Sequence, residues 1–388
     1  FVIIRIIRKN RNKMQFRDLV KQYNVLKPEI DKAMIDTAAS GGYIMGKPVK
    51  ALEASLAEYV GVKHCISCAN GTDALTLALM AWNIKNGDAV FVPDFTFFAS
   101  AEVVSLAGAT PVFIDVDVDT FNIDVKSLEK AIKKTLQEGK LTPRVIITVD
   151  LFGLPADYFA AKEIADRYNL LILEDGAQGF GGKINDRMAC SFGDISTTSF
   201  FPAKPLGCYG DGGAVFTNND EWAEIMNSLK VHGKGSFKYD NVRIGVNSRL
   251  DTLQAAILQV KFDAFKNYEA EAINKAAVLY TKKLQGIVKT PIIPEGYYSS
   301  WAQYTIRLKD RGQRDGLQAY LKEQGIPSMV YYPTPMHGQT AYKHLNYPAG
   351  SNPVTQQLCA TVLSLPIHPY ITEEEIGKVV KAVKEYLG

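Results

Sequence analysis

The stretch RVIITVDLFGLPADYFAAKEIADRYNLLILEDGA, residues 144–177, decides the fold class. It begins with an apolar, β-branched run (144–152), continues with apolar residues at helical spacing (157–169) and ends in a second apolar run (170–177). The two apolar runs predict strands and the segment between them predicts a helix. A helix that joins two buried strands is typical of a parallel sheet, so the stretch predicts an α/β fold.

The same alternation extends on both sides, from about residue 64 to 218. Helical patterns separate several of the predicted strands, among them 72–82, 99–108 and 125–137. We therefore expect a mostly parallel central sheet flanked by helices, with ligands gathered at the carboxyl ends of its strands. The further strand candidates are HCISC (64–68), AVFVPD (89–94), TPVFIDVD (110–117), ISTTSFF (195–201) and GAVFTN (213–218).

The remaining chain predicts a second, smaller unit. Residues 249–286 form the pattern of one long helix, and the segments after it mix strands such as YTIRL with helices. We expect a large domain over 14–260 and a small C-terminal α/β domain over 261–388, with the helical stretch at 15–40 packing near the small domain. Residues 1–13 hold five basic residues and no acidic one, and we interpret them as an upstream extension or an expression artefact.

Composition excludes several classes of protein. The net charge is +3, which gives no reason to expect a nucleic-acid or membrane partner, and no apolar run is long enough for a transmembrane helix. Five scattered cysteines suit a reducing cytoplasm. Cys65 and Cys68 form a C-x-x-C, but no second pair accompanies them, so we expect buried thiols and no metal site.

Two segments at predicted strand ends suit an anionic, ring-shaped ligand. In ANGTDAL (69–75), Gly71 lets the backbone turn closely, and the free N–H groups of Thr72 and Asp73 at the start of a helix can bind phosphate, although a simple capped turn explains the segment equally well. In LILEDGAQ, Asp175 ends a very apolar strand, where a charge is costly without a cationic partner. An N-cap is the alternative for Asp175, and Gln178 lies three residues further on.

Two more segments complete the set. In VPDFTFFAS (92–100), Phe97 follows a strand and suits either the core or stacking on a planar ring. In SFFPAKPLGCYGDGGA (199–214), Lys204 lies between two prolines on a glycine-bounded turn, and Ser199 precedes it by five residues. A phosphate cradle, an aromatic plate, a buried carboxylate and a constrained lysine together are what pyridoxal 5′-phosphate requires. The sequence contains no G-x-G-x-x-G after an early strand, no P-loop, no H-E-x-x-H and no G-x-S-x-G.

From Met14 to the C-terminus the chain resembles the DegT/StrS family of pyridoxal-phosphate-dependent sugar aminotransferases, which have the fold-type I architecture. Several motifs look closest to the WbpE-type members, which use glutamate to aminate C3 of a UDP-linked 3-keto-hexuronic acid. The resemblance is carried, in this order, by GGYIMGKPVKALEASLAEYVG, NGTDAL, VPDFTFFASAE, EDGAQ, SFFPAKPLGCYGDGGA, GVNSRLDTLQAAIL and SLPIHPY.

The resemblance implies a role for each cofactor residue. Lys204 would form the Schiff base and then move the proton between cofactor and substrate carbons, which argues for transamination, because relatives with histidine there are dehydratases. Asp175 would pair with the pyridinium nitrogen and Gln178 would lie beside the ring. Asn247 would reach the phosphate of a neighbouring subunit, which implies a homodimer with shared sites. Gly71, Thr72 and Ser199 would hold the phosphate, and Phe97 would stack on the ring.

The substrate residues are implied less directly. Arg249 is a candidate for binding a substrate carboxylate, or it only braces the start of a helix. Tyr331 and Tyr332 are candidates on the sugar side, and Tyr331 stands where the family commonly has histidine. Asp150 stands where histidine or serine is frequent and is also expected to face the sugar, whereas Gly176 replaces a usual alanine.

We therefore expect a cytoplasmic ping-pong aminotransferase of surface polysaccharide biosynthesis. Glutamate would leave as 2-oxoglutarate, pyridoxamine 5′-phosphate would carry the amino group, and a nucleotide-linked keto-sugar would receive it. Two alternatives stay open: a 4-aminotransferase acting on a UDP- or dTDP-4-keto-6-deoxy sugar, and a non-catalytic protein of the same fold with a regulatory role.

Overall fold

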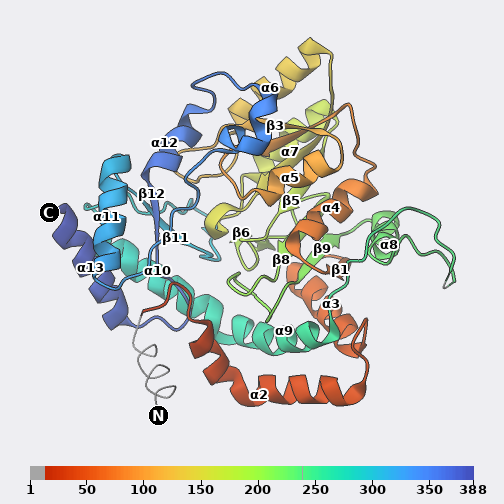
Figure 1. The fold of residues 1–388 in the computed structure, drawn as a ribbon, viewed down its shortest axis with the longest axis horizontal. Coiled ribbons are helices and arrows are strands. Elements are labelled where there is room, and N and C mark those ends of the chain that lie inside the picture. Colours follow the sequence, from red (N-terminus) through yellow and green to blue (C-terminus); the bar gives the residue numbers. More distant parts are fainter. Residues whose placement is uncertain (1–13, 238) are drawn as a thin grey trace.

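A seven-stranded sheet lies at the centre of the computed structural model, which describes residues 14–237 and 239–388 (Figure 1). Its strand order is β1-β9-β8-β5-β4-β2-β3. Only β9 runs antiparallel to its neighbours, so the prediction of a mostly parallel α/β sheet is confirmed. The strands are β1 (His64–Cys68), β2 (Asp88–Pro93), β3 (Thr110–Ile114), β4 (Thr142–Val149), β5 (Leu171–Asp175), β8 (Ile195–Ser199) and β9 (Gly213–Thr217).

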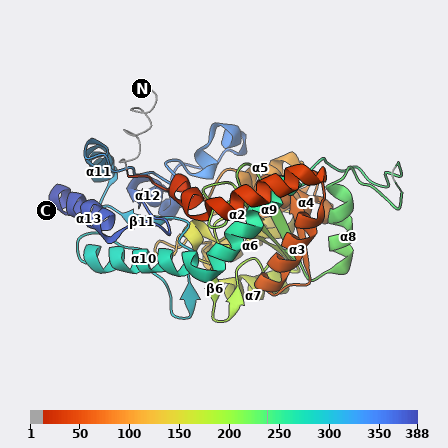
Figure 2. The same ribbon diagram turned by 90° about the horizontal axis from the view of Figure 1, so that it is seen from below.

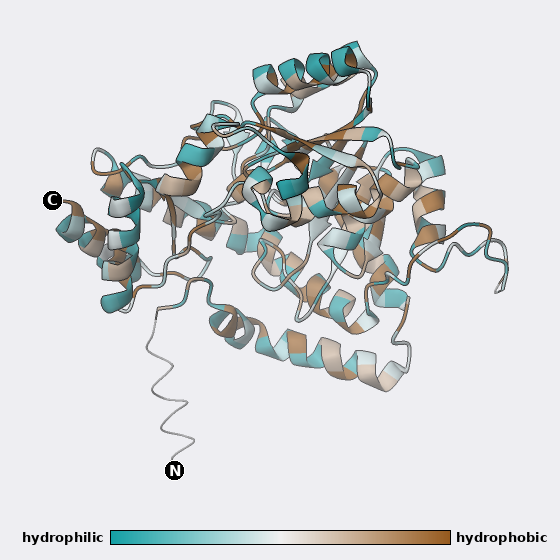
Figure 3. Ribbon diagram, turned by 45° about the horizontal axis from the view of Figure 1, so that its top comes forward, coloured by the Kyte–Doolittle hydropathy of each residue, from teal (hydrophilic) through white to brown (hydrophobic). Residues whose placement is uncertain are grey.

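Helices cover both faces of this sheet. Along β4, Val145 and Ile147 face one hydrophobic core while Ile146 faces the other, as the two-residue period of a strand requires. The first core includes residues of α4 (Gly71–Ala81), α5 (Ala99–Leu106) and α8 (Asp220–Leu229). The second includes residues of α6 (Val125–Glu138) and α7 (Tyr158–Tyr168). Hydrophilic residues lie on the outer faces of the helices (Figure 3).

Short polar side chains fix where many helices begin. Asn70 accepts a hydrogen bond from the third backbone N–H of α4, and Asp157 does the same for α7. Each such cap satisfies an N–H group that has no partner inside the helix. Thr372 and Glu375 form a capping box at the start of the last helix. The same kind of cap opens α2, α6, α8 and α11, through Asp18, Asp124, Asn219 and Asp310.

The predicted long helix is continuous and carries one irregular turn. It consists of α9 (Thr252–Ala264), a π-helical turn (Phe265–Glu269) and α10 (Ala270–Leu284). The N-terminal helix α2 (Leu19–Ser40) lies along α9, as Figures 1 and 2 show. Its first turn reaches the C-terminal part of the chain, because Lys21 Nζ donates to the carbonyl of Tyr370 at 2.6 Å.

The C-terminal part has a core of its own. Strands β11 (Tyr304–Arg307) and β12 (Val362–Leu365) pair antiparallel and pack against α10, α11 (Arg311–Glu323) and α13 (Glu373–Leu387). The predicted domain boundary at residue 260 falls inside α9 and stays a prediction. Residues 1–13 lie outside the described residues. The described chain also contains α3 (Lys47–Val60), α12 (Pro353–Thr361) and two 3-10 helices (Met336–Gly338 and Thr340–Leu345). A small sheet consists of β10 (Tyr297–Tyr298), β6 (Lys183–Ile184) and β7 (Arg187–Met188).

Some strands end earlier than the sequence predicts. β8 stops at Ser199, because Phe200 and Phe201 already belong to the lysine turn, and β4 stops at Val149 before a 3-10 turn over Leu151–Gly153. β3 likewise ends at Ile114. The two-residue strands β6, β7 and β10 are too short to give any sequence pattern.

Over the described ranges, no helix has the length and apolar character needed to span a membrane.

Candidate active site

The predicted cofactor residues meet at the carboxyl ends of two neighbouring parallel strands. Asp175 is the last residue of β5, and Ser199 is the last residue of β8. Gly71, the first residue of α4, lies against Ser199: a Cβ atom added to Gly71 would come within 2.6 Å of the Ser199 Cβ. Only glycine allows this approach, so α4 begins directly beside the end of β8.

The start of α4 has the geometry of an anion site. The expectation that the N–H of Asp73 is free for phosphate is wrong, because Asn70 Oδ1 caps it at 2.8 Å. The N–H groups of Gly71 and Thr72 remain at the open end of the helix. Ser199 Oγ accepts the N–H of Phe201 at 3.2 Å, so its hydroxyl hydrogen remains available to a ligand. Helix N–H groups and a hydroxyl are the donors that a phosphate needs.

Asp175 is a buried carboxylate without a cationic hydrogen-bond partner in the described part of the chain. Its side chain accepts hydrogen bonds from Ser100 Oγ at 2.7 Å and from the N–H of Ala177 at 3.2 Å. Two neutral donors orient a carboxylate but do not neutralise its charge. The arrangement therefore fits a ligand that brings a protonated nitrogen.

Lys204 lies half-buried on a turn whose ends are tied together. The N–H of Cys208 donates to the carbonyl of Phe200 at 2.8 Å, and the N–H of Phe200 donates to the carbonyl of Gly212 at 2.7 Å. Burial lowers the pKa of the Lys204 amine, the charge of Asp175 opposes this shift, and Arg17 adds to it. A lowered pKa increases the neutral fraction, which is the nucleophilic form of the amine.

Gln178 and Tyr332 form another wall of the site. Gln178 Oε1 accepts the N–H of Phe152 at 2.8 Å, and its Nε2 donates to the Tyr332 hydroxyl at 3.2 Å. The Phe97 side chain is 52% exposed, and its ring centroid lies 6.2 Å from that of Tyr332. An aromatic side chain this exposed at a strand end is free to cover a planar ligand, and the stacking role that the resemblance implies for Phe97 stays a prediction.

Asn247 and Arg249 lie apart from this group within one chain. Together they line a separate pocket with Ala69, Gly210 and Asp211. Among the described residues, no hydrogen bond or ion pair joins either side chain to Lys204, Asp175 or Ser199. Tyr331 precedes Tyr332 and contacts Phe16 at a centroid distance of 6.1 Å.

The expectation that Asp150 faces the sugar is wrong. The side chain is fully buried and accepts hydrogen bonds from Tyr158 Oη at 2.6 Å and from the N–H of Ala156 at 3.0 Å. Burial, reinforced by the charge of Glu174, raises the pKa of Asp150 well above its usual range. The Asp150 side chain can point into the protein because Gly179 has no side chain. A Cβ atom on Gly179 would collide with the Asp150 carboxylate.

Two residues of the site could not be predicted from the sequence. Ser100 orients Asp175 from α5, 75 residues away in the chain. Arg17 Nη2 donates to the carbonyl of Pro205 at 3.4 Å, and its buried Nη1 has no hydrogen-bond partner among the residues that the structure describes. Ser100 ends the quoted segment VPDFTFFAS but carries no signal of this role, Arg17 belongs to no motif, and only the folded chain brings them to Asp175 and Lys204. The structure also explains why glycine stands at position 176, because a Cβ atom there would lie 2.6 Å from Cys190 Sγ.

Comparison with known proteins identifies relatives that match nearly the whole chain. Residues 24–384 match the DegT/DnrJ/EryC1/StrS aminotransferase family. A UDP-2-acetamido-2-deoxy-3-oxo-D-glucuronate aminotransferase from Pseudomonas aeruginosa is 42% identical over 95% of this chain and 99% of its own length. A pleiotropic regulatory protein from Geobacillus stearothermophilus is 43% identical over 95% of this chain and 97% of its own. A UDP-N-acetyl-3-dehydro-α-D-glucosamine 3-aminotransferase from Acidithiobacillus ferrooxidans is 39% identical, with the same shares of 95% and 97%.

Solved structures agree with these relatives. A DegT/DnrJ/EryC1/StrS aminotransferase from Brucella abortus superposes with a TM-score of 0.94 at 50% identity, covering 97% of this chain and all of its own. NtdA from Bacillus subtilis, solved with bound pyridoxamine phosphate, superposes with a TM-score of 0.86 at 28% identity, covering 94% and 82%. The fold and the cofactor chemistry expected from the sequence are thus found together in known structures.

Proposed function

Since the chain belongs to the DegT/DnrJ/EryC1/StrS aminotransferase family, we propose that it transfers an amino group from glutamate to C3 of a UDP-linked 2-acetamido-3-keto-hexuronic acid. The chain is an enzyme that uses pyridoxal 5′-phosphate. The observation that carries the proposal is the meeting of Lys204, Asp175, Gly71 and Ser199 at the ends of β5 and β8. A purely regulatory protein has no need of such a set.

The residues fit pyridoxal phosphate group by group. The open N–H groups of Gly71 and Thr72, with the Ser199 hydroxyl, suit its phosphate. Asp175 suits its ring nitrogen, because a buried carboxylate keeps that nitrogen protonated. When bound, the cofactor supplies an electron sink for the charge that develops at the substrate carbon.

The protein side of the reaction then consists of binding and proton transfer. Lys204 Nζ holds the cofactor and afterwards carries the proton between the two reacting carbons. Its lowered pKa keeps part of the amine neutral and able to accept that proton. Phe97, Gln178 and Tyr332 fix the plane in which the exchange takes place.

We assign the substrate carboxylate to Arg249, which shares a pocket with Asn247 and, like it, would serve the site of the partner subunit. Two of the relatives described above are named as aminotransferases of UDP-linked sugars: one is named for a 3-oxo-glucuronate, and the other as a 3-aminotransferase of a 3-dehydro sugar. Arg249 is half-buried in a pocket with Asn247, and no carboxylate of the described residues pairs with it. A guanidinium with free donors matches the geometry of a carboxylate. Tyr331 and Tyr332 complete the sugar side of the proposal.

Replacing Arg249 with alanine is expected to raise KM for the 3-keto-hexuronic acid nucleotide by about 10- to 100-fold, the value of a lost charged hydrogen bond. KM for a 4-keto-6-deoxy sugar nucleotide, which has no carboxylate, should change by less than about threefold. Steady-state kinetics with both substrates gives the answer, and Arg167→Ala on the exposed face of α7 is a matched control. Equal effects on both substrates would reject Arg249 as the carboxylate ligand and favour the 4-aminotransferase alternative.

We also propose a homodimer in which Asn247 serves the site of the partner. An excursion over residues 231–237 and 239–247 leaves the body of the molecule beside α8 and contains brown, hydrophobic segments (Figures 1 and 3). Its side chains Phe237, Val242 and Ile244 are 65%, 54% and 90% exposed. Exposed apolar side chains at this density are typical of an interface.

Complementation tests the shared site directly. Lys204→Ala and Asn247→Ala chains are each expected to be inactive, but mixed dimers would contain one intact site. Co-refolding the two variants should restore about a quarter of the wild-type activity, because half of the dimers are mixed and each has one working site. No recovery from a mixture of demonstrated heterodimers would contradict the assignment of Asn247.

The five free cysteines support a cytoplasmic enzyme, and surface polysaccharide biosynthesis is the proposed use of the product.

A further inference from the structure

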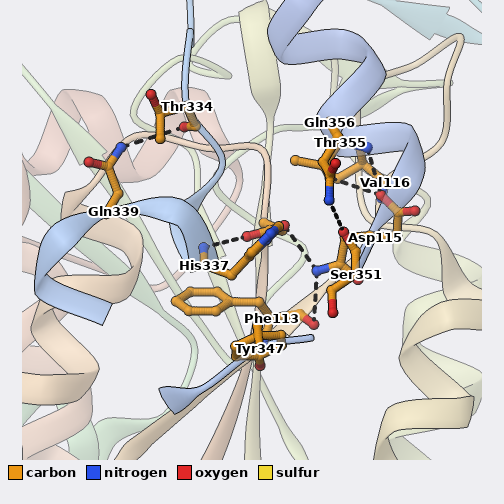
Figure 4. Close-up of polar contacts among 12 residues, drawn as sticks. Phe113, Asp115, Val116, Thr334, His337, Gln339, Tyr347, Ser351, Thr355 and Gln356 are labelled. Carbon is orange, nitrogen blue, oxygen red and sulfur yellow. Dashed lines mark hydrogen bonds and ion pairs between the residues drawn. The ribbon is translucent and has the colours of Figure 1, made fainter. Parts of the chain in front are cut away.

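A buried carboxylate at the end of β2 holds a C-terminal segment against the sheet. Asp94 directly follows β2 and is fully buried. Its Oδ1 accepts the N–H of His337 at 2.8 Å, and its Oδ2 lies 2.5 Å from His337 Nδ1 and accepts Asn352 Nδ2 at 3.0 Å. The N–H of Met336 also donates to the Asp94 carbonyl at 2.9 Å. We call Asp94, His337 and Asn352 the clamp. Figure 4 shows His337 with its contacts drawn as dashed lines.

The neighbouring carboxylate, Asp115, has a different task. It follows β3, and its Oδ1 accepts both the N–H and the hydroxyl of Thr355 at 2.8 Å, while its Oδ2 accepts the N–H of Val354 at 3.1 Å (Figure 4). These are the first free N–H groups of α12, whose own N-cap residue makes no capping hydrogen bond. Asp115 therefore holds only the start of α12, whereas Asp94 holds Asn352, the residue before that helix, and also the segment that leads back to the site.

The clamp connects two segments that wall the proposed active site. Asp94 precedes Phe97 by three residues, and His337 follows Tyr332 by five. Between the two segments, the Tyr332 ring lies 6.3 Å from that of Phe95 and 6.2 Å from that of Phe97. Gln178 Nε2 donates a hydrogen bond to the Tyr332 hydroxyl. The segment over 332–337 is therefore held at one end by Gln178 and at the other by the clamp. Loss of the clamp would weaken one end and leave the backbone hydrogen bond from Met336 to the Asp94 carbonyl and the ring contacts between the two segments.

We propose that the clamp positions Tyr331 and Tyr332 against the Phe97 side chain, so that Asp94 and His337 are positioning residues for binding of the keto-sugar. The inference rests on the proposed function. Neither residue is among those that would touch the cofactor or the reacting carbons. Their effect is expected on KM, because they act on the wall that receives the sugar.

The charges around His337 make the clamp sensitive to pH. The hydrogen bond to Asp94 raises the pKa of His337; burial opposes this shift, and the charges of Asp94 and Asp115 add to it. The ring of Tyr347 lies 5.6 Å from that of His337, and its hydroxyl accepts the N–H of Phe113. A raised pKa means that the ion pair stabilises the clamp fully below the ordinary pKa of histidine and weakens as pH rises through the raised value. The wild-type KM should therefore increase on the alkaline side.

The test compares four variants of the full-length enzyme. His337→Ala removes the side-chain contact, and Asn352→Asp sets a second carboxylate beside Asp94, so each should raise KM for the keto-sugar about tenfold with little change in kcat. His337→Gln keeps an amide donor for Asp94 but cannot titrate. It should restore a near-normal KM at neutral pH and make KM independent of pH on the alkaline side. Thr355→Ala weakens only the Asp115 contacts and is the matched control, with KM within about twofold of wild type.

A second readout does not need a working enzyme. Backbone hydrogen exchange of 95–98 and 331–337 is measured in the cofactor-free, full-length protein, and both segments should exchange faster in His337→Ala and Asn352→Asp than in Thr355→Ala. If the clamp variants match Thr355→Ala in exchange and in KM, the clamp only stabilises the fold and the inference is overturned. If no variant or wild type transfers an amino group, the proposed function fails while the exchange data still decide whether the clamp orders both segments.

Discussion

Replacing Lys204 with alanine is expected to abolish amino transfer and leave the fold intact. The side chain would supply both the bond to the cofactor and the group that moves the proton, so its loss should lower kcat/KM by at least about 10⁴-fold. The turn itself is held by backbone hydrogen bonds from Phe200 and Cys208, which alanine preserves. Activity, the visible absorbance of the cofactor and circular dichroism are measured on the same preparation.

Stability separates a chemical effect from unfolding. Because the pKa of Lys204 is lowered in the folded chain, the folded state binds this proton less tightly than the unfolded state. The lysine thus reduces stability fully below its folded pKa, and this penalty declines as pH rises through that value and vanishes above the ordinary pKa of lysine. The cofactor-free Lys204→Ala protein should therefore melt no lower than wild type at neutral pH. Lys162→Ala, a change of an exposed lysine on α7, is the control, and full activity of Lys204→Ala would contradict the assignment.

Replacing Asp175 with asparagine is expected to lower kcat by about 10³-fold, the size of effect seen when one preorganised electrostatic contact is lost. Asparagine has the same shape, and its amide oxygen still accepts the hydrogen bond of Ser100. What it lacks is the charge that holds the ring nitrogen protonated. Kinetics and the visible spectrum of the bound cofactor report this loss.

A second variant tests whether the loss of activity in Asp175→Asn comes from the lost negative charge. Ser100→Ala keeps the carboxylate and removes one of its two donors, so kcat should fall by only about tenfold. If Asp175→Asn reduces activity no more than Ser100→Ala does, the carboxylate is a structural group and not the partner of the ring nitrogen.

The sheet could be predicted because each of its strands carries a local signal. Runs such as 144–152 and 170–177 are apolar, β-branched and separated by helical spacing, and all seven predicted strands of the large sheet are present. The positions of Lys204, Asp175, Ser199 and Gly71 follow from the same patterns, because each lies directly at a strand end or a helix start. Boundaries were less predictable, as β8 shows: the apolar residues after Ser199 pack in the lysine turn and not in the strand.

What could not be predicted depends on contacts between distant segments. Asp150 carries no sequence signal that distinguishes a sugar-facing carboxylate from one buried under Gly179. Ser100 and Arg17 reach the site across 75 and 188 residues of chain. The clamp likewise joins Asp94 to His337 over 243 residues. Such partners are set by the packing of complete elements, on which local patterns contain no information.

The most direct test of the proposed reaction is a half-reaction followed by visible absorbance. The purified enzyme is loaded with pyridoxal phosphate and mixed separately with a UDP-linked 3-amino-hexuronic acid and with a 4-amino-6-deoxy sugar nucleotide. We predict that the cofactor band at visible wavelengths disappears with the first compound and persists with the second. A band that persists with the first compound and disappears only with the second would contradict the proposed substrate, and a protein that forms no such band would contradict the role of Lys204.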